Sequence, residues 1–390
     1  MISFKISAPG KVILFGEHAV VYGKTALAAS VNLRSHLYFS ELASSSENHV
    51  HIDMPLVSLN KKVPLSLIRS NLLAPDFPIL SIVGHDIFYD KIEAFVKLLE
   101  CADPRQFHSL LCLFYALTQT VQDRGLTVKP FKIKLETELP IGAGAGSSAS
   151  FAVCLTAAFI QWARLQSPEA DAASLSSFDF ETLGQVSTHA YNCEKIMHGR
   201  PSGIDNSVCT YGAVIQFQRN EPIKCRTLGD KQFRALLVDT KVGRSTKDLV
   251  ARLAQLKSSY PQIFDKVINA IDEVSLCAID LFHRMESLDE CSDRMEIECK
   301  ELMNLIHINQ GLLNTCQVSH ASLDTICIIA RNHGLAAKLT GAGGGGFAYV
   351  LIPPYESHDK VQKLNSELVS NGFSVTETIL GGSGVQIHSV

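Results

Sequence analysis

The residues best suited to chemistry lie in the segment GAGAGSS (142–148), where three glycines alternate with alanines before two serines. The strand-like FKIKLET (131–137) precedes the segment, and the small and apolar residues after it predict a helix over about 147–165. The first N–H groups of a helix have no partner within it, and the helix dipole adds partial positive charge there. Glycines let the backbone approach an anion closely, and the serine hydroxyls can bind phosphate or Mg²⁺. The segment therefore predicts a phosphate-binding loop.

Two commoner glycine motifs do not fit this chain. The dinucleotide-binding fingerprint requires G-x-G-x-x-G, whereas the glycines of 142–148 are spaced G-x-G-x-G. A Walker A loop requires four residues between its glycines, but six separate Gly16 from Gly23, so we expect Lys24 and Thr25 in a solvated loop. The glycines of 142–146 could instead form a flexible linker without a binding role. This alternative fits poorly, because linkers rarely join a strand to an apolar helix without a break.

A second glycine cluster, LTGAGGGGFAYV (339–350), lies between a predicted helix and a predicted strand. Its four consecutive glycines fit a plain tight connection. They equally allow close backbone approach to a ligand from the other half of the chain. Taken alone, the cluster leaves both interpretations open.

A carboxylate stands on the apolar face of the helix predicted over 180–198. Leu183, Ala190 and Met197 mark this face at steps of seven, and Glu194 falls on it. A buried carboxylate is costly unless it meets a cation, and the dipole near the helix C-terminus adds to the cost. The cation is either a buried lysine or arginine, or a metal ion. Mg²⁺ prefers few protein oxygens plus phosphate and water, which Glu194, Ser148 and a nucleotide would supply.

Further charged residues need partners. Asp205 lies in HGRPSGIDNS (198–207), which we expect to form a constrained loop before a strand. Asp205 is either an ordinary turn former or, in a phosphoryl-transfer enzyme, the acceptor of a hydroxyl proton. Lys11 begins an otherwise apolar strand, which suggests that its ammonium group is held in place. Glu17 and His18 follow where that strand ends; a lone histidine is usually structural, but this pair could also contact substrate.

Composition narrows the class of protein. The 390 residues suffice for about two domains, and 46% apolar and 19% charged residues are typical of a globular protein. A net charge of −4 without a basic block gives no sign of nucleic-acid binding. The eleven cysteines are scattered without a C-x-x-C pair, which favours a reducing compartment over a disulfide framework or a zinc site. The N-terminus lacks signal-peptide character, and the longest apolar run, 151–160, is too short to span a bilayer. We expect a cytoplasmic protein with no membrane partner.

Strand and helix patterns alternate in both halves, which predicts an α+β fold. We expect strands over 11–15, 26–39 and 208–217, hairpins and loops over 41–80, and helical segments over 91–123. A polar stretch, 219–232, is the candidate domain boundary, dividing the chain into domains 1–228 and 229–390. The second domain is expected to contain helices over about 246–258, 262–286, 293–315, 320–332 and 358–370.

Together these segments resemble the GHMP kinase superfamily, and within it the branch that phosphorylates mevalonate. The matching motifs are APGKVILFGEHAVVYG (8–23), LPIGAGAGSSAS (139–150), KLTGAGGGGF (338–347), EKIMHGRPSGIDN (194–206) and DTKVGRSTK (239–247). The first motif discriminates within the superfamily, because galactokinases typically place Asp-Tyr after Gly-Glu-His, where Ala19 and Val20 stand here.

The resemblance implies roles for individual residues. Asp205 would be the base toward the C5 hydroxyl of mevalonate, with Lys11 between it and the ATP phosphates. Ser148 and Glu194 would hold Mg²⁺. The nucleotide would be bound by Lys11, Thr137, Gly142, Ala143, Gly144, Ala145, Gly146, Ser147 and Ser148. The mevalonate site would be bordered by Glu17, His18, Thr246 and Thr340.

The resemblance also implies a fold and partners. The expected fold is a ribosomal-protein-S5-like N-terminal domain and a ferredoxin-like C-terminal domain with the active site between them. Family members are commonly homodimers, act in isoprenoid and sterol precursor synthesis, and are often inhibited by prenyl diphosphates that compete with ATP. The chain departs from the family where Ala145 replaces a leucine, removing apolar bulk expected near the nucleotide. It also carries Met54-Pro55-Leu56 where relatives have Leu-Pro-Asn near the adenosine, so no nucleotide contact is assigned to Leu56.

Two other functions are compatible with the same segments. A non-catalytic sugar or nucleotide sensor could use this fold, but a sensor should have lost the base or the metal ligands, and Asp205, Lys11, Ser148 and Glu194 are all present. A small-sugar kinase is the enzymatic alternative, and Ala19 with Val20 argues against it.

Overall fold

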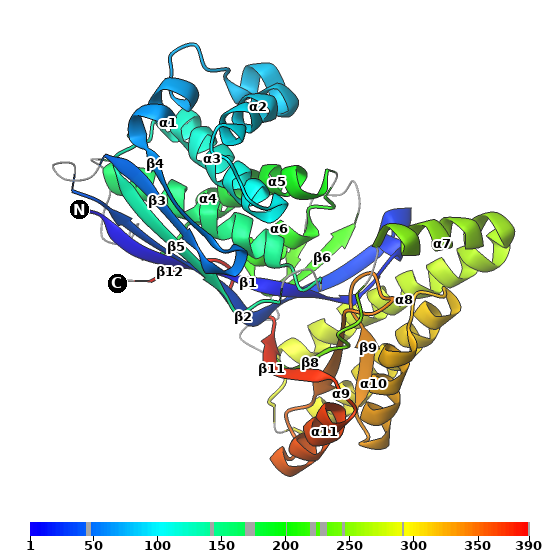
Figure 1. Cartoon of the computed structure of the whole chain (residues 1–390). Helices are drawn as coiled ribbons and strands as arrows, with labels where there is room; N and C mark the ends of the chain where they lie inside the picture. The colour runs from blue at the N-terminus through cyan, green and yellow to red at the C-terminus, as the bar shows by residue number, and fades with distance from the viewer. Residues whose placement is uncertain are drawn as a thin grey trace.

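The computed structural model describes residues 1–43, 48–140, 144–167, 176–199, 201–218, 224–226, 232–243, 246–290 and 292–388. Within these residues, twelve strands form one sheet that is antiparallel at every strand pair except β3–β5. Figure 1 shows two lobes joined through this sheet, with helices packed on each. The predicted α+β class is confirmed.

The first lobe is built on the long strand β2. The strands of this lobe are β1 (Ser3–Phe15), β2 (Thr25–Glu41), β3 (His49–Met54), β4 (Leu59–Pro64), β5 (Phe131–Thr137), β6 (Val214–Gln218) and β7 (Lys224–Arg226). β2 pairs antiparallel with β1, β5 and β6. β3 and β4 form the hairpin expected in the 41–80 region. The end of β1 is buried, and β2 pairs with it along one edge.

Helices cover one face of this part of the sheet (Figure 1). They are α1 (Leu65–Leu72), α2 (Leu80–Lys97), α3 (Pro104–Arg124), α4 (Ser147–Gln166), α5 (Phe180–His198) and α6 (Ile204–Tyr211), with short 3₁₀ turns at Ala19–Tyr22 and Pro55–Val57. α4 is apolar on all sides because it is packed between α3, α5 and the sheet. By length and composition α4 could cross a membrane, but 72% of its most apolar window is buried in the protein, as in a core helix.

The second lobe has a smaller sheet and longer helices. Its strands are β8 (Phe233–Asp239), β9 (Ala336–Leu339), β10 (Phe347–Ile352) and β11 (Ser374–Leu380), in the order β11-β8-β10-β9. Its helices are α7 (Thr246–Ser259), α8 (Pro261–Glu286), α9 (Asp293–Thr315), α10 (Ala321–Asn332) and α11 (His358–Ser370). All of these helices lie within one or two residues of the ranges expected from periodicity.

The two lobes share a sheet and a core. β11 pairs with β2 at Leu380 and Val31, and one apolar cluster contains Val12 of β1 together with Phe233 of β8. The chain then returns to the first lobe, where β12 (Gln386–His388) pairs with β1. Residues of both candidate domains are thus interleaved at the ends of the chain, and most of the candidate boundary at 219–232 lies outside the described residues.

One expected strand was wrong in its first part. Residues 208–211, expected to begin a strand, form the end of helix α6, and only Val214–Gln218 is a strand. The expected loop over 198–207 is correspondingly shorter, and Asp205 lies in the first turn of α6. Gly203, at a φ of 89°, precedes the helix. The strand-forming residues Val208, Thr210 and Tyr211 concealed this short helix, because tertiary packing outweighs strand propensity.

Candidate active site

A cavity of about 640 Å³ lies between the first lobe and the glycine cluster of the second. This volume is in the range of small-molecule sites. Its lining contains nine of the residues expected to form the site: Lys11, Thr137, Gly144, Gly146, Ser147, Ser148, Glu194, Asp205 and Thr246. From the second lobe, Gly341 and Ala342 also contribute. Positions far apart in the sequence are therefore brought to one site.

Lys11 is the centre of the charged groups. Its ammonium group lies 3.3 Å from Asp205 Oδ2 and donates to the carbonyl of Gly144 at 3.3 Å. The backbone N–H of Lys11 also donates to the carbonyl of Ala145 at 2.9 Å. The Lys11 side chain is 8% exposed and that of Asp205 is 33% exposed, so the lysine is held while the carboxylate reaches the cavity. One residue of β1 thus links the glycine loop to the first turn of α6.

The glycine loop opens the N-terminus of α4 toward the cavity. Gly146 caps the helix in the left-handed conformation, with φ 78° and no side chain to occupy the first N–H groups. A Cβ at Gly146 would lie 2.9 Å from Cγ of Lys11, so only glycine lets the loop pass this closely. The arrangement can receive an anion at the helix N-terminus beside a fixed ammonium group.

Glu194 is buried, and no described lysine or arginine lies within ion-pair distance of it. The residue is 2% exposed, and Oε1 has no hydrogen-bond partner among the described groups. In the described part of the chain, its nearest basic partner is His198, with Nε2 3.9 Å from Oε2. Burial, reinforced by the nearby Asp205, raises the pKa of Glu194 to about 8, whereas Ser148 and Lys11 act in the opposite direction. Lys11 thus acts on Glu194 only from beyond ion-pair distance, so a directly paired lysine or arginine, one of the two explanations open from sequence, is not found among these residues.

The hydroxyl of Ser148 lies on the same side of the cavity. It makes a 3.0 Å hydrogen bond with Nε2 of His198, and burial lowers the pKa of that histidine. Among the described residues no group of three histidine, cysteine or acidic side chains is clustered for a metal. Ser148 and Glu194 would instead suit an ion that takes most of its ligands from phosphate and water.

Four expected site residues do not line the cavity, namely Glu17, His18, Thr340 and Ala145. Glu17 is buried in an ion pair with Lys338, and the hydroxyl of Thr340 bonds to the backbone of Ile13. His18 lies just behind the wall, with Nε2 2.8 Å from the carbonyl of Ala342.

Ala145 also differs from its expected position. It is 2% exposed and packs in the core shared by the lobes, so its side chain does not supply or remove bulk near the cavity. Its backbone nevertheless holds Lys11 in place through the carbonyl. Gly142 and Ala143 lie outside the described residues.

The apolar end of the cavity was missed from the sequence. It is lined by Met54, Leu56, Val57, Leu135, Phe151 and Met197, with the polar side chains Arg105, His108 and Ser109 from the start of α3. The spacing of Arg105, His108 and Ser109 places them on one helix face, which was the available signal. Leu56, to which no contact was assigned, is 48% exposed at this end.

Comparisons with known proteins find relatives over nearly the whole chain. Residues 111–213 match the GHMP kinases N terminal domain, and residues 295–371 match the GHMP kinases C terminal domain. Mevalonate kinase of Mus musculus is 35% identical over 98% of this chain and 95% of its own length. Mevalonate kinase of Homo sapiens is 34% identical over 98% and 94%. The crystal structure of the Methanococcus jannaschii mevalonate kinase matches with a TM-score of 0.69 at 22% identity, covering 98% of this chain and 99% of that one.

Proposed function

The chain belongs to the mevalonate kinase family of the GHMP kinases, and from this membership we propose that its cavity transfers the γ-phosphoryl group of ATP to the C5 hydroxyl of mevalonate. The protein is an ATP-dependent kinase with the GHMP kinase fold, and mevalonate is its acceptor. The product would be 5-phosphomevalonate, an isoprenoid and sterol precursor. The observation that carries the assignment of roles is the Lys11–Asp205 pair at the cavity wall.

Asp205 is the proposed base. Its carboxylate would accept the proton of the C5 hydroxyl while the hydroxyl oxygen bonds to the γ-phosphorus and the bond to the departing ADP oxygen breaks. Lys11, 3.3 Å away, would stabilise the alkoxide character of that oxygen and the charge on the transferred group. A lysine fixed by the loop carbonyl is suited to this task because it needs no reorganisation during the reaction.

Mg²⁺ is the proposed metal, held by Ser148 and Glu194 with the ATP phosphates. Oε1 of Glu194 has no hydrogen-bond partner among the described groups, and a cation there would balance the buried carboxylate. When bound, the ion would neutralise charge on the β- and γ-phosphates. Glu194 itself would also orient the hydroxyl of Ser148.

ATP is proposed to lie along the cavity from the N-terminus of α4 to the apolar end. The N–H groups after Gly146 would receive the phosphates, with Thr137 beside the nucleotide. Met54, Leu56 and Phe151 would contact the flat adenine base. Mevalonate would occupy the remaining side, bordered by Thr246 and Ala342.

Regulation and assembly follow from the resemblance. We propose a homodimer, inhibited by prenyl diphosphates that compete with ATP. The cavity supports such competition because an anion site and an apolar end lie in one space. Cytoplasmic location is proposed because the nine cysteines whose side chains the structure describes are all free thiols, as expected in a reducing compartment.

A coupled ADP-release assay with mevalonate, galactose and homoserine side by side tests the proposed function. We expect turnover with mevalonate alone. Turnover with galactose in preference to mevalonate would favour the small-sugar kinase, and ATP binding without any turnover would favour the sensor.

A further inference from the structure

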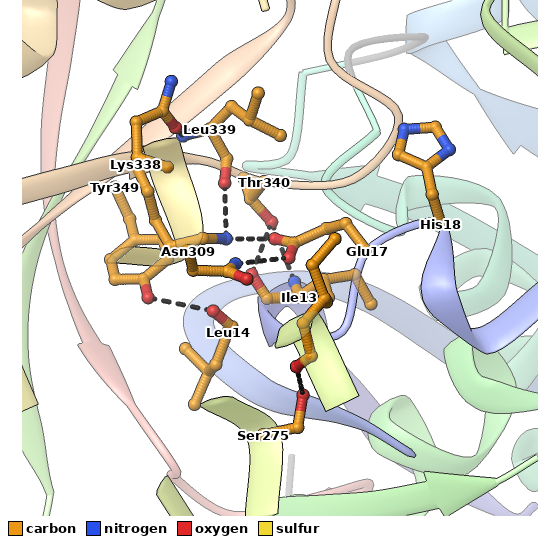
Figure 2. A network of polar contacts seen from close by, with 12 residues as sticks. Ile13, Leu14, Glu17, His18, Ser275, Asn309, Lys338, Leu339, Thr340 and Tyr349 are labelled. Atoms are coloured by element: carbon orange, nitrogen blue, oxygen red, sulfur yellow. Dashed lines mark hydrogen bonds and ion pairs between the residues drawn. The ribbon is translucent and has the colours of Figure 1, made fainter. Parts of the chain in front are cut away.

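The link between β1 and β2 is held mainly by residues of the second lobe. The carboxylate of Glu17, in this link, forms a buried ion pair with Lys338 of β9, and Oε2 accepts a hydrogen bond from Asn309 of α9 at 3.1 Å. Asp272 of α8 accepts from the backbone of Thr25 at 2.8 Å at the far end of the link. Figure 2 shows Glu17 pointing into the second lobe, away from His18. Both carboxylate oxygens are therefore engaged in a contact between lobes.

The partners of Glu17 are arranged around it. Lys338 is fully buried, donates to the carbonyl of Leu339 at 2.8 Å and lies 5.5 Å from the ring centroid of Tyr349. Burial lowers the pKa of Lys338, and Glu17 opposes this effect. Asn309 is also fully buried, and its carbonyl oxygen has no hydrogen-bond partner in the described part of the chain. Among the described residues, the side-chain amide of Asn309 donates its hydrogen bond to the carboxylate of Glu17.

A buried ion pair such as that of Glu17 and Lys338 is an inefficient way to stabilise a fold. Removing two charges from water costs free energy that their attraction only partly returns, and apolar side chains of similar volume often stabilise as well. A buried pair does, however, fix the relative position of the two segments that carry it. The segments joined here are the end of β1 and the end of β9.

Both segments continue directly to the rim of the cavity. On one side, His18 follows Glu17 with a φ of 63°, a left-handed conformation that is strained for histidine. On the other side, two residues after Lys338, Thr340 bonds to the N–H and carbonyl of Ile13 at 2.8 and 3.0 Å. Gly341 and Ala342 then form the cavity wall, and the His18 imidazole reaches the Ala342 carbonyl at 2.8 Å.

We propose that Glu17 and Lys338 are a positioning pair that holds His18 against Ala342 at the mevalonate end of the cavity. This inference rests on the proposed function and deepens it. Neither side chain lines the cavity. Their loss would loosen the wall that contacts mevalonate while leaving the phosphate loop, which belongs wholly to the first lobe, in place.

The test compares Lys338→Met with the double variant Glu17→Gln/Lys338→Met. The single variant leaves Glu17 buried without a cation, so its melting temperature should fall. In the double variant no buried charge is unpaired, so the melting temperature should recover. If the pair positions the wall, KM for mevalonate should remain raised about tenfold or more in the double variant, with kcat within about threefold and KM for ATP unchanged.

Glu298→Gln is the matched control. Glu298 is a buried carboxylate of the same lobe, paired with Arg284 and Arg294, and none of the three residues lines the cavity. Its replacement should lower the melting temperature and change neither KM. Titration calorimetry with mevalonate provides a readout independent of turnover.

A double variant with the parental KM for mevalonate would overturn the inference, as would an equal rise in both KM values. An unchanged mevalonate affinity by calorimetry would do the same. Absence of mevalonate turnover in the parent chain contradicts the proposed function instead, and the inference fails with it. The two failures are therefore distinguishable.

Discussion

Three side chains at the cavity wall carry the proposed chemistry, and each is held differently. Lys11 is fixed by a loop carbonyl, Asp205 by its place in the first turn of α6, and Glu194 by burial. Of these, only Glu194 lacks a matching partner in the described part of the chain. The three residues can therefore be separated by mutation, because each loss should change a different measured quantity.

Replacement of the base should affect the chemical step. We expect Asp205→Ala to lower kcat about a thousandfold or more, equivalent to roughly 4 kcal/mol of transition-state stabilisation. ATP binding should survive, because the phosphate loop does not depend on Asp205. Single-turnover kinetics and equilibrium ATP binding measure the two effects, and near-normal turnover would contradict the assignment.

Replacement of the proposed metal ligand should affect the Mg²⁺ requirement and the stability of the metal-free protein. We expect Glu194→Gln to raise the Mg²⁺ concentration needed for half-maximal rate. In EDTA no metal is bound, and the pKa of Glu194 is raised to about 8. Between the ordinary pKa of a glutamate and pH 8, the folded state therefore binds more protons than the unfolded state. Stability of the parent should therefore fall as pH rises through this range. The Gln variant should lack this fall, and an unchanged Mg²⁺ titration together with an unchanged pH profile would exclude the role.

At the scale of elements, the site depends on the joint between the glycine loop, α4 and β1. The loop passes so close to β1 that Lys11 bonds to it through both backbone and side chain. Gly146 is the residue that permits this approach. The same backbone conformation leaves the helix N-terminus without a cap from a side chain, so positioning and anion binding have one cause.

A methyl group added at Gly146 should weaken both the packing of the loop against β1 and the binding of ATP. Gly146→Ala places a Cβ 2.9 Å from Lys11 in a left-handed backbone, so we expect a loss of about 1–3 kcal/mol of unfolding free energy and a higher KM for ATP. Gly311→Ala is the control. Gly311 lies in helix α9, and a Cβ added there would meet nothing within 4 Å. The control should gain up to about 1 kcal/mol with unchanged kinetics. Chemical denaturation and steady-state kinetics compare the pair, and equal behaviour would refute the steric argument.

At the scale of the whole molecule, the lobes are not independent. They share the β2–β11 pairing and an apolar cluster, and the chain ends by adding β12 to the first lobe. Arg34 strengthens this return by donating to the carbonyls of Ser383 and Gly384 at 3.1 and 2.6 Å. The lobes should therefore unfold together.

The single tryptophan allows this expectation to be tested. Trp162 is fully buried in the first lobe, 5.0 Å from the ring of Phe131, so its fluorescence reports on that lobe alone. Far-UV circular dichroism reports on helices of both lobes. We expect the two urea-unfolding curves to coincide, as for one cooperative unit. A tryptophan transition clearly separated from the dichroism would show that the lobes unfold independently.

Local patterns in the sequence determined much of this protein. Helices of the second lobe followed from apolar periodicity, and the strand at 131–137 and the helix at 147–166 followed from composition and spacing, because these signals act over neighbouring residues. The same reasoning located Glu194 on an apolar face. Local reasoning failed at 208–211, where residues that favour strands form the end of α6 because of their packing within the first lobe.

The sequence by itself therefore determined the family and the α+β class, and it supplied candidate residues for the proposed chemistry, since motifs and periodicity are local. Only the tertiary structure decided which of these residues meet. It put Lys11 beside Asp205, left Glu194 without a lysine or arginine among the described residues, and turned Glu17 away from the cavity toward Lys338. The physical reason is that burial and pairing of charges depend on contacts between residues up to several hundred positions apart, and no local pattern encodes those contacts.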